Sequence, residues 1–258
     1  MSKILVIREF DQFSRFLSEN GFEVLNLPLI ETNPLDDLSE FKARIEKIEK
    51  YDGIFLTSRH AAQILADEVR EKKIDFSGKV YILGNRSFEI LRGAGFELIF
   101  DETANTAREM LERIAPEDLK SGRFLFVRGE RSMRVVPDFL RNLATVDETI
   151  VYETRSIKID NEQIKHIRGE LKSGEFAAAC FFSPSAAESF LEQFDAEVLH
   201  QIAIATIGET TAEFFERRNL SVDFISPKVS AEDFAVELVD YLKEDLPTKH
   251  TKSTKKGI

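Results

Sequence analysis

The chain has 258 residues, a formal net charge of −11, 43% hydrophobic residues and 31% charged residues. This length suits one large or two ordinary domains, and the acidic balance argues against broad nucleic-acid binding. No apolar run is long enough to span a membrane, and the first residues have a strand pattern rather than a signal-peptide pattern. The single cysteine, Cys180, lies in an apolar run and excludes an internal disulfide, so we expect a protein of the reducing cytoplasm.

Strand and helix patterns alternate from the start of the chain. An apolar strand at 3–8 is followed by a helix at 10–21 and by a second strand at 22–31, which Pro28 interrupts. Because proline cannot donate to a strand ladder, this second strand is expected at an edge or between domains. The elements expected next are a helix at 38–50, a strand at 52–58, a helix from 59, a strand at 79–84, a helix from 85, and a short strand and helix within 97–114.

The same order of patterns begins again at residue 123. The corresponding segments lie at 123–143, 148–159, 175–191, 203–218 and 222–239. The offset is 125 between Ser58 and Ser183, 124 between Gly84 and Gly208, and 124 between Thr106 and Ser230. Such steady offsets indicate two homologous halves. The last residues, 247–258, have a basic composition without apolar periodicity, which predicts a disordered tail.

Alternating strands and helices predict parallel sheets that are covered by helices. In such sheets ligands bind beyond the carboxyl ends of the strands, where helix N-termini present free N–H groups to carboxylate or phosphate. A hydroxyl at one such turn is more often only a helix cap. Here, however, small polar residues recur at turn after turn. We therefore expect two lobes that enclose a cleft for a polyanionic small ligand. The turn residues are Thr57, Ser58, Gly84, Asn85, Ser87, Asn105, Thr106, Ser183, Ser185, Gly208, Thr210, Thr211 and Ser230.

Several kinds of catalytic machinery are missing from the sequence. It contains no glycine-rich dinucleotide motif, no P-loop, no nucleophile elbow and no paired metal ligands, so we expect neither cofactor nor metal. No base stands near Ser183 or Ser185, and His60 is expected to be a surface or cleft-edge residue rather than a base. Arg128 and Arg134 flank a loop on the same side, although simple solvation explains them equally well.

Tyr152 is the candidate for acid chemistry. A strand tyrosine is more often a packing residue, but this strand is expected to pass along the cleft, where a phenol can deliver a proton.

Five segments, read in order, resemble the uroporphyrinogen-III synthase family: IFLTSRHAAQIL, LGNRSFEILRGAGF, IVYETR, FFSPSAAESF and IGETTAEFFERRNL. The resemblance runs from Lys3 to about Leu242. It implies closure of the linear tetrapyrrole hydroxymethylbilane to uroporphyrinogen III with inversion of the last pyrrole ring, without cofactor or metal. The substrate of the family carries eight carboxylates, which agrees with the ligand class inferred above. Such proteins act as monomers, and a transient hand-over from the upstream bilane-forming enzyme is the partner that the resemblance implies.

The resemblance also implies an interleaved α/β architecture: two flavodoxin-like lobes joined by a two-stranded antiparallel linker that acts as a hinge. The lobes are then 1–29 with 157–246, and 30–156, followed by the tail at 247–258. The repeat alone places the boundary near 115–121 instead.

Carried over residue by residue, the family's cleft hydroxyls fall on Ser58, Ser87, Ser183 and Thr211, and its turn glycines on Gly84 and Gly208. Ser87 stands where the family commonly has a threonine, and the neighbouring Arg86 adds a cation that could hold a carboxylate. Tyr152 falls on the tyrosine that is proposed to protonate the departing hydroxyl. Loss of that hydroxyl would give an azafulvene, which the last ring would attack to form a spiro intermediate. Fragmentation and reclosure of this intermediate would give the inverted isomer. The substrate-binding set that we predict is Arg8, Thr57, Ser58, Gly84, Asn85, Arg86, Ser87, Arg128, Ser183, Ser185, Gly208, Thr210 and Thr211.

Two other functions use similar clefts. A sugar-phosphate isomerase would have the same Ser/Thr turns but needs a positioned base, which the sequence does not show. The non-enzymatic alternative is a two-lobed sensor of anionic ligands or a tandem receiver module. A receiver needs an acidic cluster and a late lysine at its strand ends, whereas these ends carry Ser, Thr and Gly.

Overall fold

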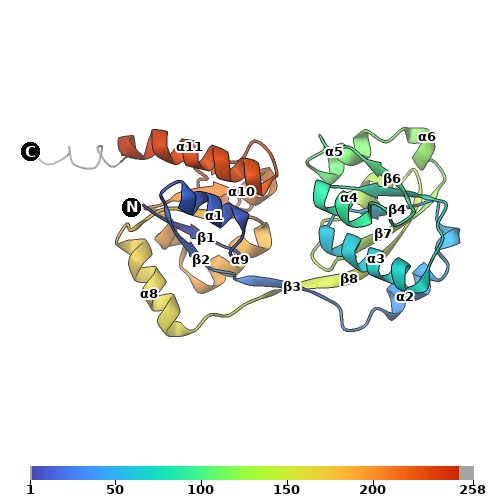
Figure 1. Cartoon of the computed structure of the whole chain (residues 1–258), viewed down its shortest axis with the longest axis horizontal. Helices are drawn as coiled ribbons and strands as arrows, with labels where there is room; N and C mark the ends of the chain where they lie inside the picture. The colour runs from blue at the N-terminus through green and yellow to red at the C-terminus, as the bar shows by residue number, and fades with distance from the viewer. Residues whose placement is uncertain (1, 250–258) are drawn as a thin grey trace, which may run out of the picture. The chain divides into compact units, whose positions relative to one another are not determined.

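The computed structural model describes residues 2–249, whose strands form one sheet of five strands and one of six. The chain divides into two units (Figure 1). Unit 1 combines the N-terminal stretch that ends at Glu31 with the stretch that begins at Arg155, and unit 2 is Thr32–Thr154. Two strands, β3 (Ile30–Pro34) and β8 (Thr145–Ser156), carry the chain from one unit to the other.

Unit 1 contains a parallel sheet in the order β11-β10-β9-β1-β2. This is the order of flavodoxin-like folds, and it reverses between β1 and β9. The elements of the unit are β1 (Lys3–Val6), α1 (Gln12–Glu19), β2 (Glu23–Asn26), α8 (Asn161–Lys172), β9 (Phe176–Phe181), α9 (Pro184–Gln193), the 3₁₀ turn η2 (Ala196–Leu199), β10 (Ala203–Thr206), α10 (Glu209–Glu216), β11 (Phe224–Ile225) and α11 (Ala231–Lys249).

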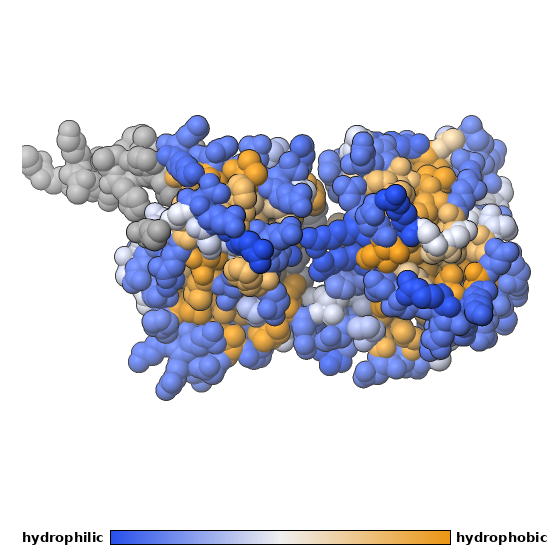
Figure 2. Space-filling view, viewed as in Figure 1, coloured by the Kyte–Doolittle hydropathy of each residue, from blue (hydrophilic) through white to orange (hydrophobic). Residues whose placement is uncertain are grey.

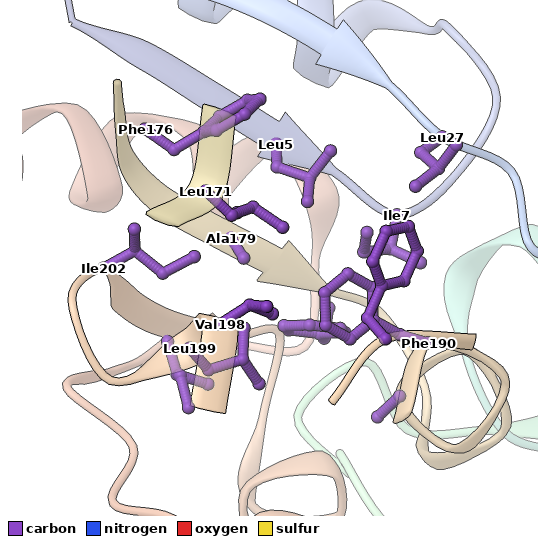
Figure 3. Packing of buried hydrophobic residues seen from close by; sticks show 14 of the residues in the cluster. Leu5, Ile7, Leu27, Leu171, Phe176, Ala179, Phe190, Val198, Leu199 and Ile202 are labelled. Carbon is purple, nitrogen blue, oxygen red and sulfur yellow. The ribbon is translucent and has the colours of Figure 1, made fainter. Parts of the chain in front are cut away.

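Both faces of this sheet are buried, as expected for parallel strands covered by helices. Leu5 faces a cluster that includes Leu171 of α8 and Phe190 of α9 (Figure 3). Ile4 faces the opposite cluster, with residues of α1 and α11. Cys180 is fully buried in that second cluster, as predicted, and burial raises the pKa of its thiol. Hydrophilic side chains cover much of the visible face over α8 (Figure 2).

Unit 2 has the sheet order β3-β8-β7-β4-β5-β6. Its strands β8, β7, β4, β5 and β6 pair in parallel, and helices cover both faces. The remaining elements are α2 (Ser39–Ile45), η1 (Ile48–Lys50), β4 (Gly53–Leu56), α3 (Arg59–Lys72), β5 (Lys79–Ile82), α4 (Asn85–Leu91), β6 (Glu97–Phe100), α5 (Ala107–Glu112), α6 (Pro116–Leu119), β7 (Arg123–Gly129) and α7 (Val135–Leu140).

The repeat seen in the sequence is present in the strand order. Replacing each strand of unit 2 by its sequence counterpart turns β8-β7-β4-β5-β6 into β2-β1-β9-β10-β11, the order of unit 1. The two units are therefore the same fold with the chain entering at different points. In unit 2 the order reverses between β7 and β4, so each unit has a topological switch point at an equivalent place.

The connecting strands are antiparallel, as predicted. The Ile157 N–H donates to the Leu29 carbonyl at 2.8 Å, and the Leu35 N–H donates to the Val151 carbonyl at 3.0 Å, so residue numbers rise on one strand as they fall on the other. Pro28 lies between β2 and β3, where no ladder needs its missing N–H. The predicted α/β fold class, two parallel-sheet lobes with a two-stranded connection, is confirmed.

The last described helix, α11, runs to Lys249 and so includes the first residues of the predicted tail. The rest of that tail, 250–258, lies outside the described residues. Within residues 2–249, no helix has both the length and the apolar character needed to cross a bilayer.

Candidate functional site

In unit 2 the first candidate turn joins β4 to α3. Thr57 and Ser58 follow the strand, and the Ser58 hydroxyl accepts the His60 N–H at 3.2 Å as the N-cap of a 14-residue helix. A hydroxyl that accepts one bond still has its own proton to donate. The start of α3 thus offers a neutral donor in the partial positive field of the helix.

The second turn of unit 2 joins β5 to α4. Gly84 has φ +86°, a conformation that residues with side chains rarely adopt, and it serves as the N-cap. Asn85 and Arg86 are exposed in the first turn, whereas Ser87 is only 2% exposed. Of the predicted residues here, Gly84, Asn85 and Arg86 are exposed and open to an outside ligand, and Ser87 is not.

Tyr152 lies on β8, where it pairs with Gly129 at the end of β7, next to the switch point between β7 and β4. Its ring centroid is 5.5 Å from that of His60, at the start of α3. Burial, and after it the charge of Arg59, lower the pKa of His60 below its ordinary value of 6.5, so the imidazole is neutral at pH 7. The structure thus places a phenol and a neutral imidazole together beside the Ser58 turn.

Arg128 is held by its own unit. Its Nε donates to Glu148 at 2.8 Å, and its Nη1 donates to the carbonyls of Gly129 and Glu130 at 2.9 and 3.1 Å. Arg134 pairs with the same Glu148 at 2.8 Å. The Arg128 side chain is 12% exposed, and its N–H groups are bonded to Glu148 and to two carbonyls of its own loop. In this structure Arg128 therefore stabilises the loop after β7.

In unit 1 the candidate residues around the switch point come from β1 and β9. The Ser183 hydroxyl caps α9 by accepting the Ala186 N–H at 3.2 Å, and it lies 3.1 Å from the Ser185 hydroxyl. Arg8 follows β1, and its guanidinium lies 4.3 Å from the ring centroid of Phe182 and 2.8 Å from Asp11. The structure therefore places a cation and two hydroxyls at the ends of the adjacent strands β1 and β9.

The α10 turn is one strand farther along, after β10. Gly208 is its N-cap, in extended backbone. Thr210 is exposed, while Thr211 is 3% exposed. This pattern repeats that of α4: the residue that follows the first helical position is open, and the next one is buried.

The turn residues of the predicted substrate-binding set lie after β4, β5, β9 and β10, and His60, expected at the surface or the cleft edge, lies beside Tyr152. Gly129 and Glu148 were not identified from the sequence. Gly129 and His60 contact the Tyr152 ring, and Glu148 binds the arginine predicted as a ligand group. The signal for Gly129 was a glycine at the end of a strand pattern, the kind of position that allows close approach of another group. Among residues 2–249, no group of three or more histidine, cysteine, aspartate or glutamate side chains could hold a metal ion.

The family model described as uroporphyrinogen-III synthase HemD matches residues 11–235. This chain belongs to the uroporphyrinogen-III synthase family. The match spans both units and every candidate turn except the Arg8 position, and it confirms the resemblance seen in the sequence. The chain is thereby an enzyme of a porphyrin-biosynthesis family, and the isomerase and sensor alternatives gain no support.

Two relatives align with nearly the whole chain. Uroporphyrinogen-III synthase of Chlorobaculum parvum is 27% identical over 94% of this chain and 100% of its own length. The enzyme of that name from Schizosaccharomyces pombe is 22% identical over 92% and 94%, respectively.

Two solved structures share the fold. A mutant uroporphyrinogen III synthase from Thermus thermophilus has a TM-score of 0.65 at 15% identity, covering 95% of this chain and 100% of that one. Uroporphyrinogen-III synthetase from Helicobacter pylori has a TM-score of 0.59 at 18% identity, covering 94% and 100%.

Proposed function

We propose that this chain converts hydroxymethylbilane to uroporphyrinogen III and water, inverting ring D through a spiro intermediate. The observation that carries the proposal is the family match across residues 11–235. The site geometry supports it, because each unit carries hydroxyl groups and helix starts at the carboxyl ends of its strands. Such groups suit an acid with many carboxylates better than they suit a nucleophilic or metal-assisted reaction.

We propose that the strand ends of both units hold the substrate carboxylates. Ser58 and Ser183 cap helices of 14 and 10 residues, long enough for an appreciable partial charge at the N-terminus. Arg86 adds an exposed cation to the α4 turn. These attractive fields are local, while the remote acidic residues are screened within a Debye length of about 8–10 Å. An acidic protein can therefore bind a polyanion at these turns.

In the proposed mechanism, Tyr152 donates its proton to the departing hydroxyl, which leaves as water. The pyrrole N–H proton lost in forming the azafulvene restores the phenol. Ring D then attacks the azafulvene carbon through its already substituted carbon and forms a spiro intermediate. The bond from the spiro carbon to the bridge carbon of the neighbouring ring breaks, and the other α-carbon of ring D closes on that bridge carbon. The proton lost from this α-carbon replaces the pyrrole N–H proton, which gives the inverted isomer.

The main task of the protein is to choose between two closures. Free hydroxymethylbilane closes spontaneously without inversion, so the enzyme must fix a conformation and exclude the competing attack. This explains why a site with one phenol and several neutral donors is sufficient.

The test is to incubate the protein with freshly made hydroxymethylbilane and to separate isomers I and III by chromatography. We expect isomer III to form faster than spontaneous closure produces isomer I. Formation of isomer I alone, at the rate seen without protein, would overturn the proposal.

We also propose that the enzyme acts as a monomer in the cytoplasm and receives its substrate by transient hand-over from the bilane-forming enzyme. The fully buried Cys180 thiol supports a reducing compartment. Analytical ultracentrifugation of the pure protein tests the oligomeric state.

A further inference from the structure

The backbone around Tyr152 contains an irregularity. Along the β7–β8 ladder, Arg128 pairs with Ile150, but the next residue, Gly129, pairs with Tyr152. The ladder therefore skips Val151. The carbonyl of Val151 accepts the N–H of Leu35, the residue that follows β3, at 3.0 Å. The Tyr152 carbonyl instead accepts the Glu130 N–H at 2.9 Å. This β-bulge turns the Tyr152 side chain over the end of β7.

The space that the Tyr152 ring occupies is available only because residue 129 is glycine. A Cβ added to Gly129 would lie 2.4 Å from the Tyr152 Cε2 and Cζ atoms and 2.8 Å from its hydroxyl oxygen. Ordinary contact distances are more than about 1 Å longer. Gly129 is not in the left-handed region, so its backbone would accept alanine and the conflict would fall on the ring.

The phenol is also bordered on a second side, by the His60 ring. The backbone of His60 is fixed by the bond from its N–H to the Ser58 hydroxyl, and the backbone of Gly129 is fixed by the bond from its N–H to the Ser132 hydroxyl at 3.1 Å. Arg128 holds the carbonyl of Gly129. The surface on which Tyr152 lies is thus itself braced by hydrogen bonds.

We propose that Gly129 is a positioning residue of the enzyme: by lacking a side chain, it seats the Tyr152 phenol over the end of β7, against His60. The inference rests on the proposed role of Tyr152 as proton donor. Misplacing a reacting group by about 1 Å can cost about a hundredfold in rate. Because the atoms that must yield are the far end of one side chain, Gly129→Ala moves the phenol without unfolding the unit.

The kinetic test is a cycle of Gly129→Ala and Tyr152→Phe. We expect Gly129→Ala to lower kcat by at least about tenfold and to change KM by less than about twofold. In the Tyr152→Phe background, we expect the same substitution to change kcat by less than about twofold, because the group that it displaces is already inactive. Wild-type kcat in Gly129→Ala, or losses that multiply in the double variant, would overturn the proposal.

A matched control lies just before the opposite end of β7. A Cβ added to Gly122 would meet the Phe124 ring at 2.7 and 2.8 Å, so Gly122→Ala creates a similar conflict with an aromatic ring away from Tyr152. We expect this variant to lose thermal stability but to keep kcat per folded molecule within about twofold of wild type. A tenfold loss of kcat in Gly122→Ala would show that general strain explains the Gly129 effect and would overturn the proposal.

A spectroscopic measurement separates this proposal from the role of Tyr152. The chain has four tyrosines and no tryptophan, so fluorotyrosine labelling gives a simple fluorine NMR spectrum in which Tyr152→Phe identifies the Tyr152 resonance. We expect Gly129→Ala to shift that resonance and Gly122→Ala to leave it in place. If the resonance does not move in Gly129→Ala, Gly129 does not determine the position of the Tyr152 phenol and the proposal is wrong. Wild-type turnover in Tyr152→Phe would instead overturn the proton-donor role of Tyr152. The fluorine resonance would still test whether Gly129 positions the phenol.

Discussion

Tyr152 shows how a residue with ordinary chemistry acquires a defined place. Its phenol lies between Gly129 and His60, at the strand end where the order of the sheet reverses. The sequence predicted the tyrosine but not its contact with Gly129, because Gly129 comes opposite Tyr152 only after the bulge skips Val151. Cross-strand register of this kind depends on long-range pairing, and no local pattern in the sequence encodes it.

Tyr152→Phe tests the proposed proton donor directly. We expect turnover to fall by at least about tenfold, because the departing hydroxyl loses its acid, while the melting temperature stays close to that of wild type. Steady-state production of isomer III and thermal unfolding are the measurements. Tyr241→Phe in α11, where the ring packs on Phe224, is the control and should keep full activity. Unchanged turnover in Tyr152→Phe would exclude the role.

His60 predicts a particular dependence of stability on pH. Its pKa in the folded protein is lowered, first by burial and then by Arg59, so the unfolded chain binds this proton more readily. Stability therefore falls as pH drops below about 6.5, the unfolded pKa, and continues to fall down to the folded pKa. Above pH 7 both states are neutral and this contribution is constant.

The comparison is between wild type and His60→Gln, by urea unfolding at pH 5, 6, 7 and 8. As pH falls from 7 to 5, the unfolding free energy of wild type should fall relative to that of His60→Gln, because only wild type carries the His60 proton equilibrium. A difference that stays flat, or that moves toward wild type, would contradict the neutral imidazole.

Among the elements, α9 has two functions at its two ends. Its first residues follow the Ser183 cap, and its last turns hold the connecting segments within unit 1. The Ser189 hydroxyl donates to the Leu29 carbonyl at 2.7 Å. The Gln193 side chain donates to the Ile157 carbonyl at 3.0 Å and accepts the Ile159 N–H at 3.1 Å. The helix that begins at the proposed Ser183 turn therefore also anchors the segments next to both connecting strands.

Gln193→Leu should destabilise unit 1 by about 1–3 kcal/mol, because a half-buried carbonyl and N–H lose their partner together. Urea unfolding at neutral pH measures the change. Gln163→Leu on exposed α8 is the matched control and should stay within about 0.5 kcal/mol of wild type. If the two variants are equally stable, the anchoring contributes nothing measurable.

Element prediction succeeded where the signal was local and failed where pairing was distant. Apolar runs, Asn20-Gly21 and the Ser/Thr caps located the strands and helix ends of both units. The repeat alone favours a boundary near 115–121, whereas β1 and β2 join the unit that begins again at Arg155. Parallel pairing of β1 with β9, more than 170 residues apart, decides this, and only the family resemblance anticipated it.

For the whole molecule, the repeat makes corresponding residues available for comparison. Each unit has a core of its own and an equivalent switch point, so equivalent turns can be altered one unit at a time. Arg86 in α4 and Thr210 in α10 hold the same position after an N-cap glycine, and both are exposed. If both units bind the substrate carboxylates, each position should contribute to substrate affinity.

We expect Arg86→Ala to raise KM by about fivefold or more, and Thr210→Ala to raise it by about two- to fivefold, with kcat nearly unchanged in both. The larger effect belongs to Arg86 because its bond to a carboxylate is charge-assisted on both sides. The two residues belong to separate units, so in the double variant the factors should multiply. Arg217→Ala, at the far end of α10 and paired with Glu213, is the control and should leave KM unchanged. If only one of the two substitutions raises KM, the substrate is held by one unit, and the shared binding of its carboxylates by equivalent turns is wrong.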